Sequence, residues 1–363
     1  MIKNLKKTAA GAVITMSLCM AASVMAFAGE VEPSGLNTIA DKKAIQAELD
    51  ETGSVTLIPG QTYHLTGPLY VKSGMHIEAT GATITADKDL FMNQPDKAGY
   101  SAITNFSVNG GTWLFSSSKG FDKSSVKLAH GQNIRLTNMT VNHNNYSGHG
   151  FEIIACKDVL IENCTLTPVG NPPKSSVEEM IQLDIAASKT APYVYALNHS
   201  LTNGACCQNV TIKGCTITGC RGICANFASS KEDEKYLSKF HSNINIINCN
   251  ITGAVSEGVM LYNVTGGKIT GNTIISKNPK RDNSRAVGLH IGSYANGKTK
   301  KMVISNNTIK GKMLAIQFWP LNAKFKKLTI SKNKVYAAGT TIDPNAVVAT
   351  NKYVVKKNKD FSY

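Results

Sequence analysis

The sequence predicts an all-β fold, a single-domain parallel β-helix (solenoid) in which short strands stack turn upon turn. Three observations predict it: two series of strand-like segments recur, their apolar residues alternate, and the copies follow each other closely. The first series opens with NIRLTNMTV. Its copies start at Asn133, Asp158, Asn209, Asn243, Gly266, Lys301 and Lys326.

The second series supplies one further strand per turn. Its copies start at Ser125, His149, Glu179, Arg221, Glu257, Arg285 and Leu314. Alternate apolar residues, such as Ile181, Leu183 and Ile185, indicate strands with one buried face. Most copies of the first series recur after 23 to 35 residues, too few for helical crossovers, so the turns must stack roughly 4.8 Å apart. One step of 51 residues holds either two turns or one turn with a long excursion.

One column of the repeat suggests a buried ladder. It runs through Met139, Cys164, Cys215, Cys249, Asn272, Asn307 and Asn333. Asparagines at one bend of successive turns can hydrogen-bond to each other and to the neighbouring backbone. We therefore interpret the cysteines of this column as small buried thiols, although disulfides are the alternative in a secreted chain.

The first 28 residues are predicted to be a signal peptide. Lys3, Lys6 and Lys7 precede an apolar run that ends in Ala26-Phe27-Ala28, the charged, apolar and A-x-A order of such signals. We expect cleavage after Ala28, secretion to the extracellular space, and no membrane association afterwards. An uncleaved membrane anchor is the alternative.

The remaining chain divides into a short linker (29–37), the coil (38–345) and a basic C-terminal tail or cap (346–363). Residues 41–50 read as a short helix that closes the first turn, because terminal repeats need a polar outer face. Without the three leader lysines the chain has 36 basic and 24 acidic residues, a charge of +12. This favours an acidic partner such as a uronate polysaccharide, teichoic acid or an anionic cell surface. No nucleic-acid motif is present, and we expect a monomer.

Particular segments resemble the pectate-lyase-like right-handed β-helix superfamily. They are the helical lid, IPGQTYHLTGPLYVKSGMHIEATGATI, TNFSVNGGTW and the N-x-T-I ladders, which together span roughly residues 38 to 340. The resemblance implies a right-handed coil. The superfamily includes polysaccharide lyases, family 28-type glycoside hydrolases, uronan epimerases and phage tailspikes. Gly148-His149-Gly150 matches the GHG motif of the family 28-type enzymes. Their N-T-D, D-D and R-I-K motifs are not found in the expected order, so their residue roles are not carried over.

Outward-facing positions of the second series are the candidate functional site. Glu152 and Asp184 lie on adjacent turns, two residues apart along the strand, a diagonal of roughly 7–8 Å. This suits the two carboxyls of an inverting glycosidase. We predict catalytic roles for these two residues and for His149 and Arg221. The predicted substrate-binding residues are Lys127, Gln182, Asn226, Glu257, Tyr262, Arg285, His290 and Trp319.

Three other interpretations stay open. A polysaccharide lyase would use Arg221, Arg285, His290 or Tyr262 as the base, with Ca²⁺ on Glu179, Asp184 and Glu257 as its only implied cofactor. A non-catalytic glycan- or surface-binding β-helix would use Trp319, Tyr262 and Phe318 for stacking. The alternating charges of Glu179, Arg221, Glu257 and Arg285 could instead be a structural cross-strand ladder.

Overall fold

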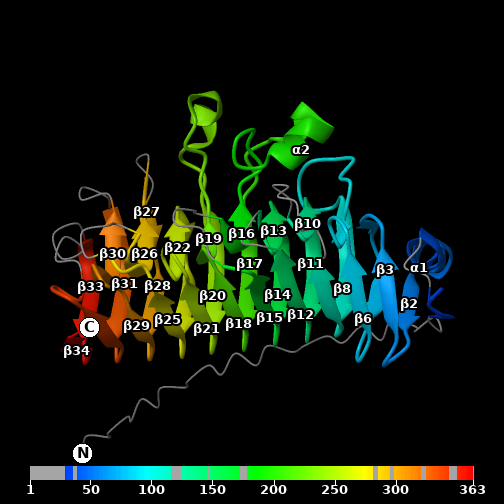
Figure 1. Ribbon diagram of the computed structural model, residues 1–363. Helices are drawn as coiled ribbons and strands as arrows, with labels where there is room; N and C mark the ends of the chain where they lie inside the picture. Colours follow the sequence, from blue (N-terminus) through cyan, green and yellow to red (C-terminus); the bar gives the residue numbers. More distant parts are fainter. Residues whose placement is uncertain are drawn as a thin grey trace, which may run out of the picture.

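The computed structural model describes residues 29–35, 39–115, 124–144, 148–171, 178–280, 285–294, 298–319, 324–342 and 350–362. The predicted signal peptide lies outside these residues. The described chain is a right-handed parallel β-helix of three sheets, which confirms the predicted fold class. In Figure 1 successive turns form rows of parallel strands, with the blue N-terminal strands at one end and the red β34 at the other.

The fourteen-stranded sheet holds the predicted first series. Its strands are β1 (Gly29–Val31), β2 (Ser54–Leu57), β5 (His76–Glu78), β8 (Ile103–Asn109), β11 (Gly131–Thr137), β14 (Lys157–Glu162), β17 (Gln208–Lys213), β20 (His241–Ile247), β23 (Val264–Thr265), β24 (Gly267–Thr270), β27 (Lys298–Lys300), β28 (Met302–Ser305), β31 (Lys324–Ser331) and β33 (Thr350–Lys356).

The eleven-stranded sheet follows each bend. Its strands are β3 (Thr62–Leu65), β6 (Thr83–Ala86), β9 (Thr112–Phe115), β12 (Thr140–Asn144), β15 (Thr165–Val169), β18 (Thr216–Gly219), β21 (Asn250–Gly253), β25 (Thr273–Ser276), β29 (Thr308–Lys310), β32 (Lys334–Ala337) and β34 (Lys359–Ser362).

The nine-stranded sheet holds the predicted second series. Its strands are β4 (Leu69–Tyr70), β7 (Phe91–Met92), β10 (Val126–Ala129), β13 (Phe151–Ile154), β16 (Glu179–Asp184), β19 (Arg221–Ala225), β22 (Val259–Tyr262), β26 (Val287–Gly292) and β30 (Leu314–Trp319). Inward residues such as Ile153, Leu183 and Leu261 are fully buried, and each contributes about 1.5–3 kcal/mol of hydrophobic stabilisation.

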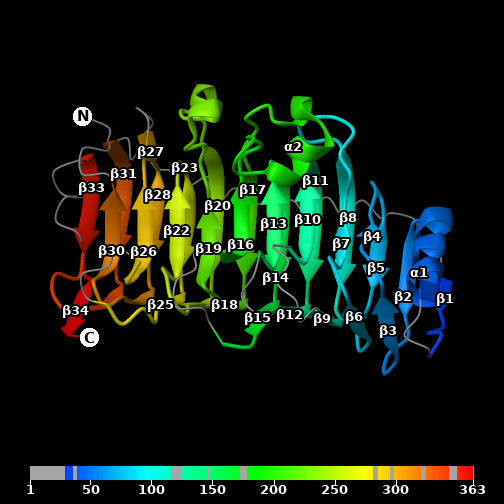
Figure 2. The ribbon, with the colours of Figure 1, turned by 45° about the horizontal axis from the view of Figure 1, so that its top comes forward.

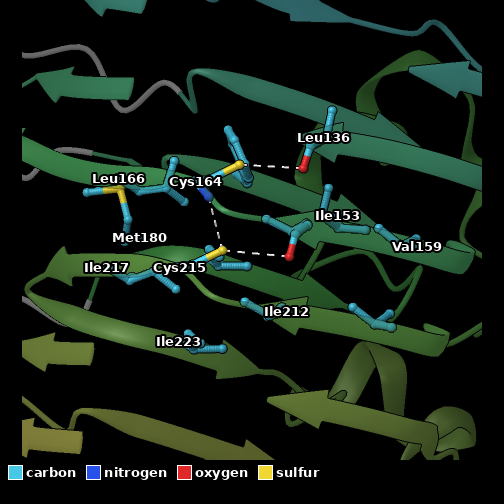
Figure 3. Close-up of a cluster of buried hydrophobic side chains, with 14 of the residues drawn as sticks. Leu136, Ile153, Val159, Cys164, Leu166, Met180, Ile212, Cys215, Ile217 and Ile223 are labelled. Atoms are coloured by element: carbon cyan, nitrogen blue, oxygen red, sulfur yellow. Dashed lines mark hydrogen bonds between the residues drawn. The ribbon is translucent and has the colours of Figure 1, made fainter. Parts of the chain in front are cut away.

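The ladder column lies where the sequence predicts it. The backbone N–H of Cys164 donates to Cys215 Sγ at 3.4 Å, and the N–H of Cys215 donates to Cys249 Sγ at the same distance. Figure 3 shows the first of these contacts among buried apolar side chains. The N–H of Cys249 then donates to Asn272 Oδ1 at 2.8 Å, and asparagines continue the pattern. All eight cysteines of the described residues are buried free thiols, so this structure contains no disulfide between them.

A helix closes the first turn, as predicted. It is α1 (Ile39–Thr52), whose Ile45 and Leu49 are fully buried against the open end of the core. Asp41 fixes it, because its carboxylate accepts the backbone N–H of Ser34 at 2.6 Å and of His64 at 2.8 Å. Figure 2 shows α1 beside β2 at the end of the stack.

Both segments predicted to flank the coil contain strands. Within the predicted linker, Gly29–Val31 pairs with β2. Within the predicted tail, β33 pairs with β31 and β34 pairs with β32. The tail continues the ladder, since Asn358 Oδ1 accepts the N–H of Asn333 at 3.0 Å.

The step of 51 residues is one turn with an excursion, because β14 pairs directly with β17 and β15 with β18. The excursion contains α2 (Pro192–Leu197) and the 3₁₀ helix η1 (His199–Leu201). In Figure 1 α2 projects beyond β10 and β13. A second loop contains the 3₁₀ helix η2 (Lys231–Tyr236). No helix in the described part of the chain has the length and apolarity needed to span a bilayer.

Candidate active site on the nine-stranded sheet

The strand register brings most of the predicted site residues onto one face. One outward row runs through Lys127, Glu152, Gln182, Cys224, Met260, His290 and Gln317. The chain turns sharply into this sheet at Gly219 and Gly253. A Cβ at either residue would lie 2.4 Å or less from a backbone oxygen, that of Arg221 or Glu257, so glycine is required there.

Glu152 and Asp184 lie on adjacent strands as predicted. Glu152 pairs in register with Gln182, and Asp184 lies two residues further along that neighbouring strand. Glu152 accepts the Ser124 hydroxyl at 2.7 Å, and Asp184 Oδ2 accepts the Gln182 amide at 2.7 Å. Both carboxyls are shielded, with Glu152 5% exposed and Asp184 completely buried.

The environment of Asp184 favours its protonated form. Burial raises the pKa of Asp184 well above its ordinary value, and the nearby negative charge of Glu152 raises it further. The amides of Gln182 and Asn226 offset only part of this rise. Asp184 Oδ1 has no hydrogen-bond partner among the described residues. The site therefore holds a buried carboxylic acid beside a second carboxyl.

A buried ion network lies beside this pair. Arg221 contacts Glu179 through Nη1, and its Nε donates to Glu257 Oε2 at 2.9 Å. Ser256 also donates to Glu257. Burial alone would raise the pKa of Glu257, but the charge of Arg221 holds it well below the ordinary value. Burial opposes the charge of Arg221, yet the two glutamates raise the pKa of its guanidinium and keep it protonated.

Two histidines end this network. His149 Nδ1 lies 3.4 Å from Glu179 Oε2, so His149 contacts Glu179 rather than the carboxyl of Glu152. His290 Nδ1 lies 3.4 Å from Glu257 Oε1. The Nε2 atom of His290 is buried and has no hydrogen-bond partner in the described residues.

The predicted alignment of Arg285 with Glu179, Arg221 and Glu257 on successive strands is wrong. The register pairs Val259 with Leu289 and Met260 with His290, two residues away from the alignment expected from the sequence. His290, not Arg285, therefore extends the network beyond Glu257. A shift of two residues keeps every inward side chain inward, so alternation cannot distinguish the two alignments.

Aromatic side chains extend the face toward the C-terminal turns. Tyr262 packs edge-on against His290, with ring centroids 5.5 Å apart, and against Phe227 at 5.1 Å. Phe227 stacks on Tyr294 at 4.4 Å. Trp319, paired in register with Gly292, is 40% exposed. Phe318, a stacking candidate, is instead buried and packs edge-on against Phe325.

The excursions that contain α2 and η2 contact each other. Asp233 of η2 accepts the backbone N–H groups of Ser188 at 3.0 Å and Lys189 at 3.1 Å, which ties the two excursions together. The α2 excursion also covers outward Ile154 with an apolar cluster that includes Val194.

Lys127, the first residue of the outward row, lies near Tyr193 of the α2 excursion. Its Nζ is 3.4 Å from Asp89 Oδ2 and 5.5 Å from the Tyr193 ring centroid. Sequence reasoning missed Asp89, Tyr193 and Tyr294, because they lie outside the repeated strands. Ser256 could have been found, since it directly precedes Glu257.

The calcium candidates do not form a metal site. Among the described residues no group of three or more His, Cys, Asp or Glu side chains could hold a metal ion. The carboxylates of Glu179 and Glu257 bind Arg221 instead. The guanidinium occupies the position between them that a cation would need.

Comparison with known proteins identifies the fold. No protein-family model and no curated protein matches the chain significantly. A structure of PfbA, a surface adhesin of Streptococcus pneumoniae, is 19% identical over 88% of this chain and 87% of that chain, with a TM-score of 0.61. A polygalacturonase from Erwinia carotovora ssp. carotovora is 13% identical over 92% and 96%, with a TM-score of 0.50.

An endo-xylogalacturonan hydrolase from Aspergillus tubingensis is also similar, at 13% identity over 92% of this chain and 94% of that chain, with a TM-score of 0.50. At these identities the similarities establish the fold alone. The chain has the right-handed parallel β-helix fold that these proteins share, as the resemblance in its sequence implied.

Proposed function

We propose that this protein is a secreted, carbohydrate-active β-helix that hydrolyses a glycosidic bond with Glu152 and Asp184. The observation that carries the proposal is the shielded carboxyl pair on one face, with one member held as a neutral acid. The backbone diagonal between the two residues is roughly 7–8 Å, and inverting glycosidases hold their carboxyls about 6.5–9.5 Å apart. The similarity in fold to the polygalacturonase and the endo-xylogalacturonan hydrolase supports this class of reaction.

The two carboxyls take complementary roles. Asp184 donates its proton to the leaving oxygen as the glycosidic bond breaks, and Glu152 accepts a proton from the attacking water. Proton exchange with solvent then restores both groups. Arg221 holds Glu179 and Glu257 in place and is a positioning residue. His149 contacts this network at Glu179.

The lyase alternative loses two of its candidate bases. The glutamates that flank Arg221 raise its pKa, and burial raises the pKa of Tyr262. Neither group is therefore a ready proton acceptor at neutral pH. Of the two that remain, Arg285 and His290, only His290 lies in the outward row, and its Nε2 has no hydrogen-bond partner in the described part of the chain, so His290 is the base that a lyase would use.

A non-catalytic glycan-binding β-helix is the second candidate function. One observation favours it: Asp184 has no exposed surface, whereas Trp319 is exposed on the same face and offers a ring for stacking. The similarity in fold to the surface adhesin supports this candidate.

One assay separates these functions. The full chain is incubated with pectin-like and neutral glycans while reducing ends and the absorbance of unsaturated uronate products are followed together. Reducing ends without this absorbance support hydrolysis, absorbance supports the lyase, and binding without either product supports the binding module. We expect Glu152→Gln and Asp184→Asn each to slow hydrolysis by about 10²- to 10⁴-fold.

Glu162→Gln is the matched control, because Glu162 is a carboxylate on another sheet that pairs with Lys213 at 2.6 Å. It should keep full activity. Activity should also fall as the pH rises through the raised pKa of Asp184, because the acid then loses its proton. Full activity in both site variants, with unchanged circular dichroism, would contradict the assignment.

A further inference from the structure

The positive charge of the chain is concentrated at the C-terminal end of the stack. Residues 298–363 contain fourteen lysines, no arginine and two aspartates, a net charge of +12. Residues 29–297 contain 22 basic and 22 acidic residues, so their net charge is zero. The entire basic excess predicted for the secreted chain therefore lies on its last turns.

These turns stack like charges in register. Lys334 of β32 pairs with Lys359 of β34, and both side chains are exposed. In the fourteen-stranded sheet, Lys326 pairs in register with Lys300. Like charges directly opposite each other are destabilising. An earlier turn shows the opposite arrangement, since Glu162 pairs in register with Lys213 in an ion pair of 2.6 Å.

Lysine also replaces asparagine at two corners of the coil. At one corner of the coil the backbone has a positive φ, in the left-handed region, at residues such as Asn133 and Asn209, with φ of 54° and 52°. Lys301 and Lys327 take the same position in the last turns, with φ of 59° and 55°. Asparagine tolerates this conformation much better than lysine does. A second corner of the coil also has a positive φ. In the last turns its residues are Lys332 and Lys357, with φ of 58° and 56°.

Two independent local costs thus accompany the lysines, electrostatic repulsion and an unfavourable backbone conformation. Natural proteins retain such costs mainly where function requires them. A concentrated positive surface attracts anions and raises their local concentration. The feature therefore indicates binding to an anionic partner.

Aromatic rings among the lysines specify the partner further. On the outer face of the eleven-stranded sheet, Lys310, Tyr336 and Phe361 pair in register on three successive turns. The Tyr336 and Phe361 rings stack with centroids 4.7 Å apart and an interplanar angle of 14°. Lys310 Nζ lies 4.8 Å from the Tyr336 ring centroid, and Phe361 is 41% exposed.

We propose that this surface, formed by Lys310, Lys334, Tyr336, Lys359 and Phe361, binds an acidic polysaccharide. The exposed ring of Phe361 packs against the apolar face of a sugar ring, and the lysines neutralise the carboxylates along the polymer. A polyphosphate carries negative charge but has no sugar ring, so it contacts the lysines and cannot stack on Phe361. The inference does not rest on the proposed hydrolysis, since this surface lies on a different sheet.

The test measures binding of the full chain to polygalacturonate, linear polyphosphate and neutral dextran by affinity electrophoresis. Lys334→Gln/Lys359→Gln should weaken binding of polygalacturonate and polyphosphate roughly tenfold. Phe361→Ala should weaken polygalacturonate binding roughly fivefold and leave polyphosphate binding unchanged. Dextran should bind much more weakly than polygalacturonate.

The matched control is Lys43→Gln/Lys97→Gln, which removes the same charge from exposed lysines near the other end of the stack. An equal loss of binding in this control would overturn the proposal, and so would an unchanged affinity of Phe361→Ala for polygalacturonate. Glu152→Gln should bind polygalacturonate with wild-type affinity. Lys334→Gln/Lys359→Gln should cleave short oligosaccharides at the wild-type rate, so failure of one proposal is distinguishable from failure of the other.

Discussion

Replacement of Arg221 by methionine tests how the nine-stranded sheet tolerates charge on its shielded face. Arg221→Met keeps the apolar stem but removes the cation that Glu179 and Glu257 share. Removing one partner from a buried ion network costs about 3–5 kcal/mol. Because two nearly buried carboxylates lose the same partner, we expect a loss of about 5 kcal/mol at neutral pH.

This loss should depend on pH with a definite sign. In the native protein the folded-state pKa of Glu257 lies below the unfolded value, so its ion pair stabilises the fold above the unfolded pKa. In the variant, burial without the cation raises the carboxyl pKa values, so the penalty is largest at neutral pH. It shrinks as the pH falls and the carboxyls take up protons. The two proteins should therefore differ less at pH 4 than at pH 7.

Urea unfolding followed by tryptophan fluorescence measures the effect, because Trp113 is fully buried in the core. The triple variant Arg221→Met/Glu179→Gln/Glu257→Gln is the control that removes the uncompensated charges together with the cation. It should recover most of the lost stability. A loss below about 1 kcal/mol in the single variant, or no recovery in the triple variant, would refute the reasoning.

Three further predictions concern the scaffold. Burial raises the pKa of the Cys156 thiol to about 12, and all eight cysteines of the described residues are buried. A water-soluble thiol reagent should therefore modify them only after unfolding. Fast modification of the native protein would contradict their burial. Asn307→Ala leaves the buried N–H of Asn272 without its 2.9 Å acceptor and should cost about 3 kcal/mol by urea unfolding, whereas Asn250→Ala, at an exposed position, should cost little. Burial lowers the folded-state pKa of His241 to about 4, so stability should fall as the pH drops from 6.5 to 4, and His241→Gln should flatten that part of the profile.

Much of the fold could be predicted because the repeat constrains it twice. Alternation of apolar residues defines the inward face of each strand, and the column from Cys164 to Asn333 fixes how successive turns align. The hydrogen bonds along that column, such as Asn307 N–H to Asn333 Oδ1 at 3.0 Å, explain why these residue types recur there. The last turn was missed although Lys357-Asn358-Lys359 repeats Lys332-Asn333-Lys334, because the preceding Tyr353-Val354-Val355 is a short continuous apolar run that shows no alternation.

The site was predictable only as far as the register was. Glu152 and Asp184 lie on consecutive strands without an ambiguous turn between their columns, so their diagonal could be read from the sequence. His290 could not be placed, because a shift of two residues leaves its face unchanged. The burial of Asp184 and the direction of its pKa shift depend on the excursions and on neighbouring charges, which no repeat encodes.

The two proposed surfaces place opposite demands on local charge, and the fold separates them. A proton-donating Asp184 needs its pKa raised, and a lysine cluster beside it would lower that pKa and remove the proton. The lysines of this surface lie on β29, β32 and β34. In the eleven-stranded sheet, β29 is four strand spacings, or roughly 19 Å, from β15, which belongs to the same turn as β16, whereas charges in physiological salt are screened over about 8 Å. An acidic polysaccharide can therefore bind the last turns without deprotonating Asp184. Lys334→Gln/Lys359→Gln should accordingly leave the pH profile of oligosaccharide hydrolysis unchanged, and a shift of its alkaline limb would show that the two surfaces are coupled.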